Sequence, residues 1–401
     1  SFGAVFFVRG GVSWIGKKPA AAAIGKVATM ADVDNRNRTR KPNRSGQPNP
    51  KREARAKAAE RHVAAVEGTC AKDIERSLAG VREFDGMPAG FVAAMKAKAQ
   101  KAAAAEAEVA EAEVAEAETA EVEAVEAAEV EDAPVEESAE GAPAEDAPAE
   151  DAAEEPALAL PEVTVLDASA TQAILDNGRG YAQFCDMAVL AFASFTNPGG
   201  GYVQGYLGQE ATLCADSYLY SVLDKQRKWY GENRRRNINC ELYRNRALVV
   251  PAVRFDRNRV HAYADVIVAA APNVKRARQE YRVSDDALLE ALRDRIRFVL
   301  AICDELGRDK LVLGAWGCDN NGFDAEAVAE LFRKELTSGD FKVKQVFFAV
   351  PSTRWDEDFA KFEHVLANFP EPNEESYAQV AARAAAARAA EQAQAAAGAD
   401  E

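Results

Sequence analysis

The sequence predicts an α/β fold, a three-layer sandwich in which helices cover both faces of a mixed, mainly parallel β-sheet. Two observations predict it. Short apolar runs alternate with amphipathic stretches throughout residues 161–369, a pattern typical of parallel strands joined by helices. In addition, the run "MAVLAFA" at 187–193 has no polar side chain, as expected of a central strand that is buried on both faces.

The apolar runs, the spacing of apolar residues and the helix-capping residues predict the individual strands and helices. Five further apolar runs predict strands, at residues 163–166, 246–253, 264–272, 310–316 and 343–350. Apolar residues recur with a helical period in five stretches, at residues 169–178, 210–226, 284–307, 324–336 and 355–369. Ser284 is placed to cap the third of these helices, and Gly307 is placed to end it.

Segments of biased composition flank and interrupt this domain. Residues 1–50 form a basic leader that we expect to be disordered, with Met30 as the expected start of translation and a true longer N-terminus as the alternative. Residues 51–97 have helical spacing and predict helices that dock on the core. Residues 98–160 are an Ala/Glu-rich acidic insert, and residues 370–401 an Ala-rich helical tail.

Charge and composition limit the classes of function. The net charge is −16, but residues 102–155 have no Lys or Arg and hold most of the excess acid, so an anionic ligand is not excluded. The basic arm at 36–57 predicts a weak contact with a polyanion, with a plain soluble leader as the alternative. The six cysteines and three histidines lack ligand spacing, so we expect no metal site. No apolar run approaches the roughly 20 residues of a membrane span, so we expect no membrane contact and a cytoplasmic protein.

A glycine triplet marks the strongest candidate site. The stretch "NPGGGYVQGYLGQEATLC" (197–214) follows the predicted strand at 187–193. Three residues without Cβ let backbone N–H groups converge on an anion, and a helix that starts near Gln209 adds a favourable partial charge. The pattern is neither Gly-x-Gly-x-x-Gly nor a P-loop. It predicts a phosphate or diphosphate site, with an ordinary turn as the alternative.

A second glycine-rich loop strengthens this interpretation. "LVLGAWGCDNNGFD" (311–324) again places glycines after a strand and before a helix, where Asp324 is suited to cap that helix. Ligands of open α/β sheets bind beyond the carboxyl ends of the strands. The two loops are therefore expected to hold one diphosphate from two sides.

These residues resemble a known family. Asn-Pro-Gly-Gly-Gly, seven residues, Gln-Glu and then Leu-Cys resembles the signature of microbial-type poly(ADP-ribose) glycohydrolases, a branch of the macrodomain fold. "CADSYLY", "YRNRALVVPAVRFDR" and "LVLGAWGC" are similar to later parts of the family's sequence. The resemblance implies a macrodomain-like fold and ADP-ribose or an ADP-ribosylated protein as ligand, without a cofactor. It leaves the oligomeric state open. The residues assigned to binding are Asn197, Gly199, Gly200, Gly201, Gln209, Glu210, Gly317, Cys318, Asn320, Asn321 and Gly322.

The sequence departs from the family at two places. The family's signature ends in Gln-Glu-Glu, and its second Glu is the catalytic acid, whereas this chain has Gln209-Glu210-Ala211. Asn320-Asn321 also replaces an apolar–aromatic pair that covers the distal ribose in the family. Successive helical residues point about 100° apart, so Glu210 does not simply take the direction of Ala211. For Glu210 we consider three roles: catalytic acid, ribose-binding residue, or an acid that only stabilises a helix N-terminus.

Three hypotheses of function follow. The first is a glycohydrolase that cleaves the ribose–ribose O-glycosidic bond with Glu210 as its acid. The second is a catalytically impaired reader that binds ADP-ribose without cleaving it. The third is a scaffold without a ligand, against which the intact Gly199–Gly201 and Gln209-Glu210 argue.

Overall fold

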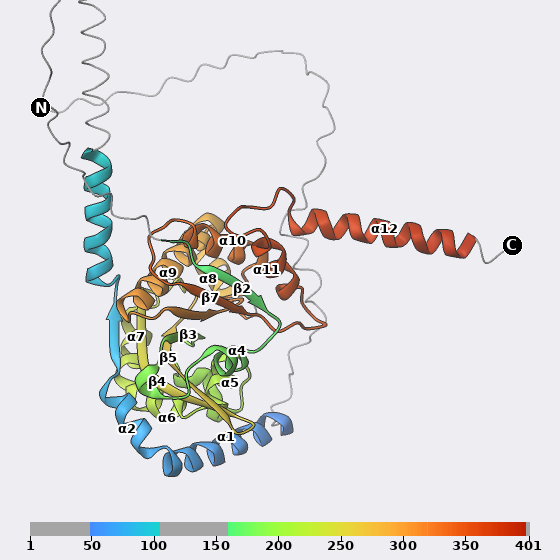
Figure 1. Ribbon diagram of the computed structural model, residues 1–401. Coiled ribbons are helices and arrows are strands. Elements are labelled where there is room, and N and C mark those ends of the chain that lie inside the picture. The colour runs from blue at the N-terminus through green and yellow to red at the C-terminus, as the bar shows by residue number, and fades with distance from the viewer. Residues whose placement is uncertain (1–48, 105–158, 319, 398–401) are drawn as a thin grey trace, which may run out of the picture. The chain divides into compact units, whose positions relative to one another are not determined.

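The computed structural model describes residues 49–104, 159–318 and 320–397. Most of the basic leader, which the sequence predicts to be disordered, and most of the acidic insert lie outside these residues. The polyanion contact predicted for residues 36–57 lies partly outside them as well. Between residues 159 and 369 the structure has the predicted alternation of strands and helices (Figure 1).

A seven-stranded mixed sheet forms the middle layer, in the order β1-β4-β5-β3-β6-β7-β2. The five neighbouring strands β5, β3, β6, β7 and β2 are parallel to one another. β4 is antiparallel to both of its neighbours, β5 and β1. The prediction of a mixed, mainly parallel sheet is therefore confirmed. The strands are β1 (Arg82–Asp85), β2 (Glu162–Leu166), β3 (Met187–Phe192), β4 (Arg246–Arg257), β5 (Val260–Ala269), β6 (Lys310–Leu313) and β7 (Gln345–Ala349).

Two apolar cores lie on opposite faces of this sheet. Alternate residues of β3 belong to different cores: Ala188 and Leu190 to one, Met187 and Val189 to the other. This is the period-two alternation of a strand that is buried on both sides. The predicted three-layer sandwich is confirmed.

The helices divide between the two faces. One core takes residues from α8 (Val274–Tyr281), α9 (Asp285–Glu305), α10 (Ala325–Leu336) and α11 (Asp358–Leu366). The other takes residues from α1 (Pro50–Thr69), α2 (Ala71–Ala79), α4 (Ala170–Asn177), α5 (Gln209–Ala215), α6 (Leu219–Leu223) and α7 (Arg227–Arg236). The C-terminal tail contains α12 (Tyr377–Ala397).

Two helices, α9 and α10, begin or end at the residues that the sequence predicts as caps. The Ser284 hydroxyl accepts a hydrogen bond from the N–H of Ala287 at 3.3 Å, and the Asp324 carboxylate accepts from the N–H of Glu326 at 3.0 Å. Gly307, just after α9, has a φ of 62°, a conformation that favours glycine. These predictions are confirmed.

The helix expected at 210–226 is broken into α5, α6 and the 3₁₀ turn η4 (Asp224–Gln226). The break has a side-chain cause. The hydroxyl of Ser217 donates to the carbonyl of Leu213 at 2.6 Å and accepts from the N–H of Leu219 at 3.1 Å. It thereby replaces backbone bonds between successive helical turns, so the helix ends and restarts.

The structure also contains elements that the apolar pattern did not predict. β1 is an edge strand with one buried residue, Phe84, and therefore has almost no apolar signal. α7 is rich in Arg, and α8 has only two buried residues, Val274 and Ala277. Each of these elements is placed by tertiary packing more than by its own composition.

The first helix contacts the segment that follows the three glycines. The guanidinium groups of Arg52 and Arg55 donate from Nε to the carbonyls of Gln204 and Gly205, each at 2.9 Å. Gly205 has a φ of 74°, and a Cβ there would lie 2.1 Å from the carbonyl oxygen of Arg52. The backbone of α1 is therefore in close contact with the segment that follows the three glycines.

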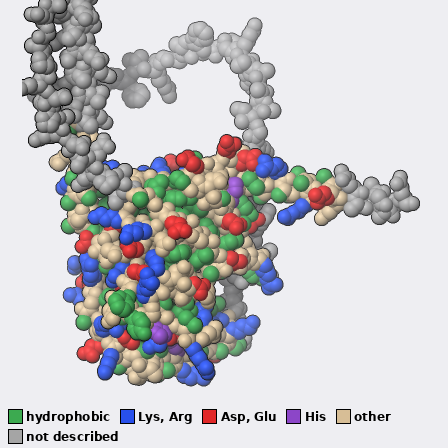
Figure 2. Space-filling model, in the orientation of Figure 1, with side chains coloured by type: hydrophobic (Ala, Val, Ile, Leu, Met, Phe, Trp, Pro, Cys, Tyr) green, Lys and Arg blue, Asp and Glu red, His purple; other side chains and the backbone are tan. Residues whose placement is uncertain are grey.

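No helix in the described part of the chain is both long enough and apolar enough to cross a membrane. On the face drawn in Figure 2, Lys and Arg side chains are interspersed with Asp and Glu over the folded part. The acidic net charge of the chain is not concentrated on this face.

Candidate functional site

A cavity of about 290 Å³ lies where the carboxyl ends of β3, β5 and β6 meet; we call it the central cavity. Its position is the one expected for a ligand site in an open α/β sheet. The lining comes from both glycine loops, from the start of α5 and from the residues that follow β5. It consists of residues 192–196, Gly200, residues 207–211, Tyr243, Ala271, Asn273, residues 315–317, Asn320 and Asn321.

The glycine triplet forms a left-handed turn. The φ angles of Gly199, Gly200 and Gly201 are 64°, 60° and 81°, a run that residues with a Cβ rarely adopt. A Cβ at Gly199 would lie 2.8 Å from the ring of Tyr220, and one at Gly201 would lie 2.8 Å from the ring of Tyr206. These two glycines are buried. Among the three, Gly200 alone lines the central cavity.

Gln209 fastens the start of α5 to the end of β3. Its side-chain amide accepts from the N–H of Phe192 and donates to the carbonyl of Leu190, both at 2.9 Å. The amide thus bonds to the strand as a neighbouring strand would. Gln209 lines the cavity, but its polar atoms hold the scaffold in place.

Glu210 is a buried carboxyl at the base of the central cavity, with 2% of its surface exposed. Oε2 accepts a hydrogen bond from the N–H of Ser194 at 2.8 Å. Burial raises the pKa of Glu210 to about 8, and the opposing hydrogen bonds from the backbone of Ser194 and Gly199 are smaller effects. Oε1 has no hydrogen-bond partner among the residues that the structure describes.

Ala211 also lines the central cavity and is 7% exposed. It follows Glu210 in the first turn of α5. Both positions of the resembled Glu-Glu pair therefore face one cavity, and one of them carries only a methyl group.

The second glycine loop forms the opposite wall. Gly317, Asn320 and Asn321 line the cavity. The Asn321 side chain donates to the carbonyl of Ala271 at 3.1 Å and so ties this loop to the end of β5. Cys318 and Gly322 were predicted to bind the ligand as well, but in this structure they do not line the cavity. Cys318 belongs to the apolar core, and a Cβ at Gly322 would lie against Lys275.

Asn197 does not join the other predicted residues. It lines a separate cavity on the far side of the glycine loop. Its side-chain oxygen accepts from Nη2 of Arg234 at 3.3 Å, and its amide donates to the Thr196 hydroxyl, also at 3.3 Å. The left-handed turn that begins at Gly199 separates Asn197 from the cavity that Gly200 faces.

An aromatic pair that the sequence analysis missed lines the central cavity. The rings of Phe195 and Tyr243 are stacked, with centroids 4.5 Å apart and planes at 14°. Tyr243 follows a loop of unusual backbone, since Asn239, Cys240, Glu241 and Tyr243 itself have positive φ. No glycine marks this loop in the sequence, so its shape had no local signal.

Two buried charged residues hold that loop. The buried Arg295 on α9 donates to the carbonyls of Tyr243 at 3.1 Å and Ala270 at 2.5 Å. Glu241, which is also buried, forms an ion pair with Arg276 at 2.8 Å and accepts from the hydroxyl of Tyr243 at 3.0 Å. These contacts fix the position of Tyr243 at the cavity wall.

A second cavity, which no sequence pattern predicted, adjoins the central one. It has a volume of about 300 Å³ and shares Phe192, Gln209 and Ala315 with the central cavity; we call it the side cavity. It lies between the start of α4 and the end of β7. Its other lining residues are Ser169, Ala170, Thr171, Thr212, Leu213, Ala349, Val350, Pro351, Thr353, Asp356 and Asp358.

Metal ligands do not gather in the described residues: no group of three or more His, Cys, Asp or Glu side chains there is placed to hold an ion.

Comparison with known proteins supports the resemblance. Residues 71–258 match the family model described as the catalytic domain of microbial-type poly(ADP-ribose) glycohydrolase. The Thermomonospora curvata poly(ADP-ribose) glycohydrolase bound to the inhibitor ADP-HPD is 31% identical, over 50% of this chain and 77% of that chain, with a TM-score of 0.45. The chain belongs to this family.

Two further structures extend the comparison. Another structure of the Thermomonospora curvata glycohydrolase is 22% identical over 77% of this chain and 98% of that one, with a TM-score of 0.53, and shares the fold. The Deinococcus radiodurans glycohydrolase in complex with ADP-ribose is 28% identical over 50% of this chain and 82% of that chain, with a TM-score of 0.45. None of the curated proteins matches.

Membership of this family indicates the general class of enzyme. Poly(ADP-ribose) glycohydrolases are hydrolases of glycosidic bonds, and this chain has their domain and their macrodomain-like fold.

Proposed function

We propose that the chain binds ADP-ribose across the central and side cavities and hydrolyses the O-glycosidic bond of the distal ribose. The observation that carries this proposal is Glu210, a buried carboxyl with a raised pKa that lies beside a phosphate-type glycine loop. A general acid needs both a position at the reacting group and a proton near neutral pH. Glu210 meets the second condition, because its pKa is about 8.

The adenine is assigned to the side cavity. Most of its lining is apolar, from residues such as Leu213, Val350 and Pro351, which suits a flat base. Asp356 and Asp358 at its edge would repel a phosphate, whereas a carboxylate can accept from an exocyclic amine. The chemistry of the lining therefore favours the base at this end of the ligand.

The diphosphate is assigned to the space between Gly200 and Gly317. Neither residue has a Cβ, and both have positive φ, 60° and 87°. Backbone N–H groups in such conformations form concave anion sites without a side-chain charge. The start of α5 adds the partial positive charge of a helix N-terminus.

The distal ribose then lies at the remaining end of the central cavity, among Tyr243, Asn273 and Asn321. In the proposed reaction the Glu210 carboxyl gives its proton to the leaving oxygen as the bond from that oxygen to the anomeric carbon breaks. Water adds its oxygen to the anomeric carbon, and the proton of the water passes to the carboxylate. The acid is restored, and the products are ADP-ribose and the released hydroxyl group.

Titration of the full chain with ADP-ribose in a calorimeter, followed by incubation with ADP-ribosylated protein, tests the proposal. We expect one bound ADP-ribose per chain and release of free ADP-ribose that is detected by chromatography. Absence of both heat and thermal shift at millimolar ADP-ribose would leave a scaffold without a ligand.

A second candidate function is a reader that binds ADP-ribose without cleaving it. Ala211 favours it, because this residue lies in the cavity at the position of the family's second Glu. Binding without release of ADP-ribose in the same incubation identifies the reader. Hydrolysis stays the first candidate function, because the central cavity has a carboxyl that can supply the acid. Among the described residues that line this cavity, Glu210 is the one with a carboxyl group.

A further inference from the structure

The segment of residues 194–196 lies between β3 and the glycine triplet and lines the central cavity. On its cavity side it makes two contacts. The N–H of Ser194 donates to the Glu210 carboxyl at 2.8 Å, and the ring of Phe195 stacks on that of Tyr243. No residue of this segment belongs to a helix or a strand, so its position depends on side chains that hold it from outside the cavity.

Asn233 on α7 holds this segment through the backbone of Phe195. Asn233 is fully buried, and its amide nitrogen donates to the Phe195 carbonyl at 2.9 Å. Its amide oxygen accepts from Nη1 of Arg246 at 2.5 Å. A flipped amide would put its nitrogen against the guanidinium and its oxygen against the carbonyl, so Arg246 fixes the orientation of the Asn233 amide.

Arg246 on β4 is itself held by several groups. It is buried, and its guanidinium carbon lies 5.5 Å from the centroid of the Trp229 ring. Two carboxylates balance its charge: Glu232 lies 3.5 Å from Nη2, and Asp85 lies 3.5 Å from Nε. A buried charge needs such partners. The hydrogen-bonded path to the 194–196 segment therefore begins at a side chain with three other contacts.

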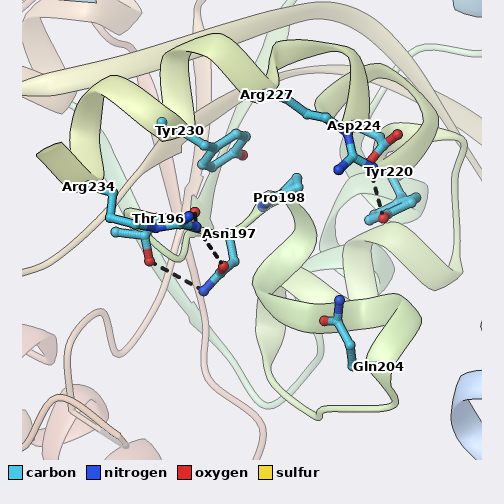
Figure 3. A pocket seen from close by; sticks show the side chains of 10 residues that line it. Thr196, Asn197, Pro198, Gln204, Tyr220, Asp224, Arg227, Tyr230 and Arg234 are labelled. Atoms are coloured by element: carbon cyan, nitrogen blue, oxygen red, sulfur yellow. Dashed lines mark hydrogen bonds and ion pairs between the residues drawn. The ribbon is translucent and has the colours of Figure 1, made fainter.

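A second side chain of α7 holds the next residue of the segment. Figure 3 shows Arg234 beside Thr196 and Asn197, and Nη2 of Arg234 donates to the Thr196 carbonyl at 2.8 Å. Arg234 is exposed, so water can replace this contact. The contact made by Asn233 is buried, and a buried carbonyl that loses its donor stays unsatisfied. The position of the segment therefore depends chiefly on Asn233.

Tyr243 is the fixed half of the stacked pair. Arg295 and Glu241 hold it through contacts that do not involve the 194–196 segment. Stacked rings tolerate centroid separations from about 4.5 to 7 Å, and the observed separation of 4.5 Å is at the short end of this range. The stack therefore does not by itself fix the partner ring, and the hydrogen bond from Asn233 does.

From these contacts we infer that Asn233 is a positioning residue of the ligand site: its amide, oriented by Arg246, sets where the 194–196 segment lies. The inference rests on the proposed function, which places the distal ribose beside Tyr243. Asn233 does not line the central cavity, so it acts on the acid through the Ser194 N–H and on the ribose through the stacked rings. A misplacement of about 1 Å costs about 10²-fold in rate. Asn233 therefore governs the rate of hydrolysis, whereas the adenine and the diphosphate are held by other residues.

The test replaces one atom. Asn233→Asp keeps an oxygen for Arg246 and puts a second oxygen where the amide nitrogen donates, so it repels the Phe195 carbonyl. On the full chain, calorimetry gives the dissociation constant and the number of sites for ADP-ribose, and chromatography gives the rate of ADP-ribose release from ADP-ribosylated protein. The rate is divided by the number of sites, so unfolded molecules do not count. We expect the rate per site to fall by about 10²-fold and the dissociation constant to change less than about threefold, because the contacts to adenine and diphosphate remain.

A control and a second variant accompany this substitution. Asn237→Asp makes the same chemical change at the residue that ends α7, where the amide donates to the carbonyl of Glu232 at 3.3 Å, and it should change neither quantity. Arg246→Gln is too short to reach Asn233, so the amide is no longer oriented. This variant should lower the rate per site and leave the dissociation constant for ADP-ribose unchanged.

An unchanged rate per site in Asn233→Asp or in Arg246→Gln overturns the inference, and so does an equal loss in Asn237→Asp. A dissociation constant that rises as much as the rate falls also overturns it, because Asn233 would then support the whole cavity.

Failure of the proposed function is visible in the wild type. If the wild type binds no ADP-ribose or releases none, the proposed function fails, and hydrogen exchange of the Ser194 amide decides the inference. Faster exchange in Asn233→Asp than in the wild type and Asn237→Asp supports a positioning role for Asn233. Equal exchange in all three overturns it.

Discussion

The carboxyl of Glu210 accepts a hydrogen bond from the backbone N–H of Ser194 at 2.8 Å, across the turn that begins the glycine loop. The same carboxyl lies close to Gly200, where a Cβ would be 2.9 Å from Oε2. One buried acid thus contacts both the end of β3 and the loop assigned to the diphosphate. A substitution of Glu210 therefore also changes the packing of the glycine loop, and a substitution of Gly200 also changes the surroundings of the Glu210 carboxyl.

Removal of this acid is expected to abolish hydrolysis. Glu210→Gln keeps the size of the side chain and an oxygen for the Ser194 N–H, but it has no proton to transfer. General acid catalysis contributes about 10²–10⁴-fold, so the rate of ADP-ribose release should fall by about that factor. Glu83→Gln, an exposed change on β1, is the control. Unchanged release from Glu210→Gln would mean that another group is the acid.

The stability of the folded chain should depend on the protonation of Glu210. Its pKa is about 8 in the folded protein and 4.5 in its ordinary state. The folded state therefore binds more protons between these values, and its extra stability is complete below about pH 4.5 and is lost as the pH rises through 8. Urea unfolding at pH 6 and pH 9 should show a larger loss of unfolding free energy for the wild type than for Glu210→Gln. Equal losses would contradict a protonated buried Glu210.

Restoring the family's second acid tests the reader. Ala211→Glu places a carboxyl at the other cavity-facing position of α5. If Ala211 limits catalysis, release of ADP-ribose should rise by about 10²-fold or more. Ala215→Glu, at the exposed end of the same helix, is the matched control. No gain from Ala211→Glu in a folded chain would show that the missing second Glu is not what limits the reaction.

Gly200→Ala should weaken ADP-ribose binding and lower the melting temperature. The substitution puts a Cβ at a φ of 60° and within 2.9 Å of the Glu210 carboxyl. Strain of this kind costs on the order of 1–3 kcal/mol. Gly68→Ala is the contrast, because it lies inside α1 with no atom within 4 Å of the added Cβ, where alanine stabilises a helix. Calorimetry and thermal unfolding of both variants check this prediction, and equal effects would contradict it.

A single added methyl group at Gly205 should disrupt the contact between α1 and the segment that follows the three glycines. Gly205→Ala adds a Cβ that would lie 2.1 Å from the Arg52 carbonyl oxygen, so α1 has to move away. We expect rapid proteolysis within α1 in this variant and slow proteolysis in the wild type. An α1 that stays protected in Gly205→Ala would show that this contact does not hold the helix.

The fold and part of the site could be predicted because their signals are local. The unbroken apolar run "MAVLAFA" predicted a strand buried on both faces, and Ser284 and Asp324 predicted helix starts through their own side chains. The glycine triplet predicted a phosphate site or an ordinary turn, and the structure shows a left-handed turn there. Gly200, Glu210 and Asn321, which the resemblance assigned to binding, line the central cavity.

Other residues depend on contacts between distant segments. Tyr243 reaches the cavity through a loop with positive φ and no glycine, held by Arg295 from α9. The lining of the side cavity comes from the ends of β3 and β7 and from α4, which are far apart in sequence. The resemblance assigned Asn197 to binding together with the triplet, but the turn places it in a separate cavity on the far side of the glycine loop. No pattern within one segment carries this information.

The most direct test of the account is a diffraction structure of the full chain soaked with ADP-ribose. We predict that the diphosphate lies between Gly200 and Gly317, the adenine in the side cavity, and the distal ribose within hydrogen-bond reach of Glu210. A central cavity without ligand in crystals at millimolar ADP-ribose, or a diphosphate bound away from both glycine loops, would contradict it.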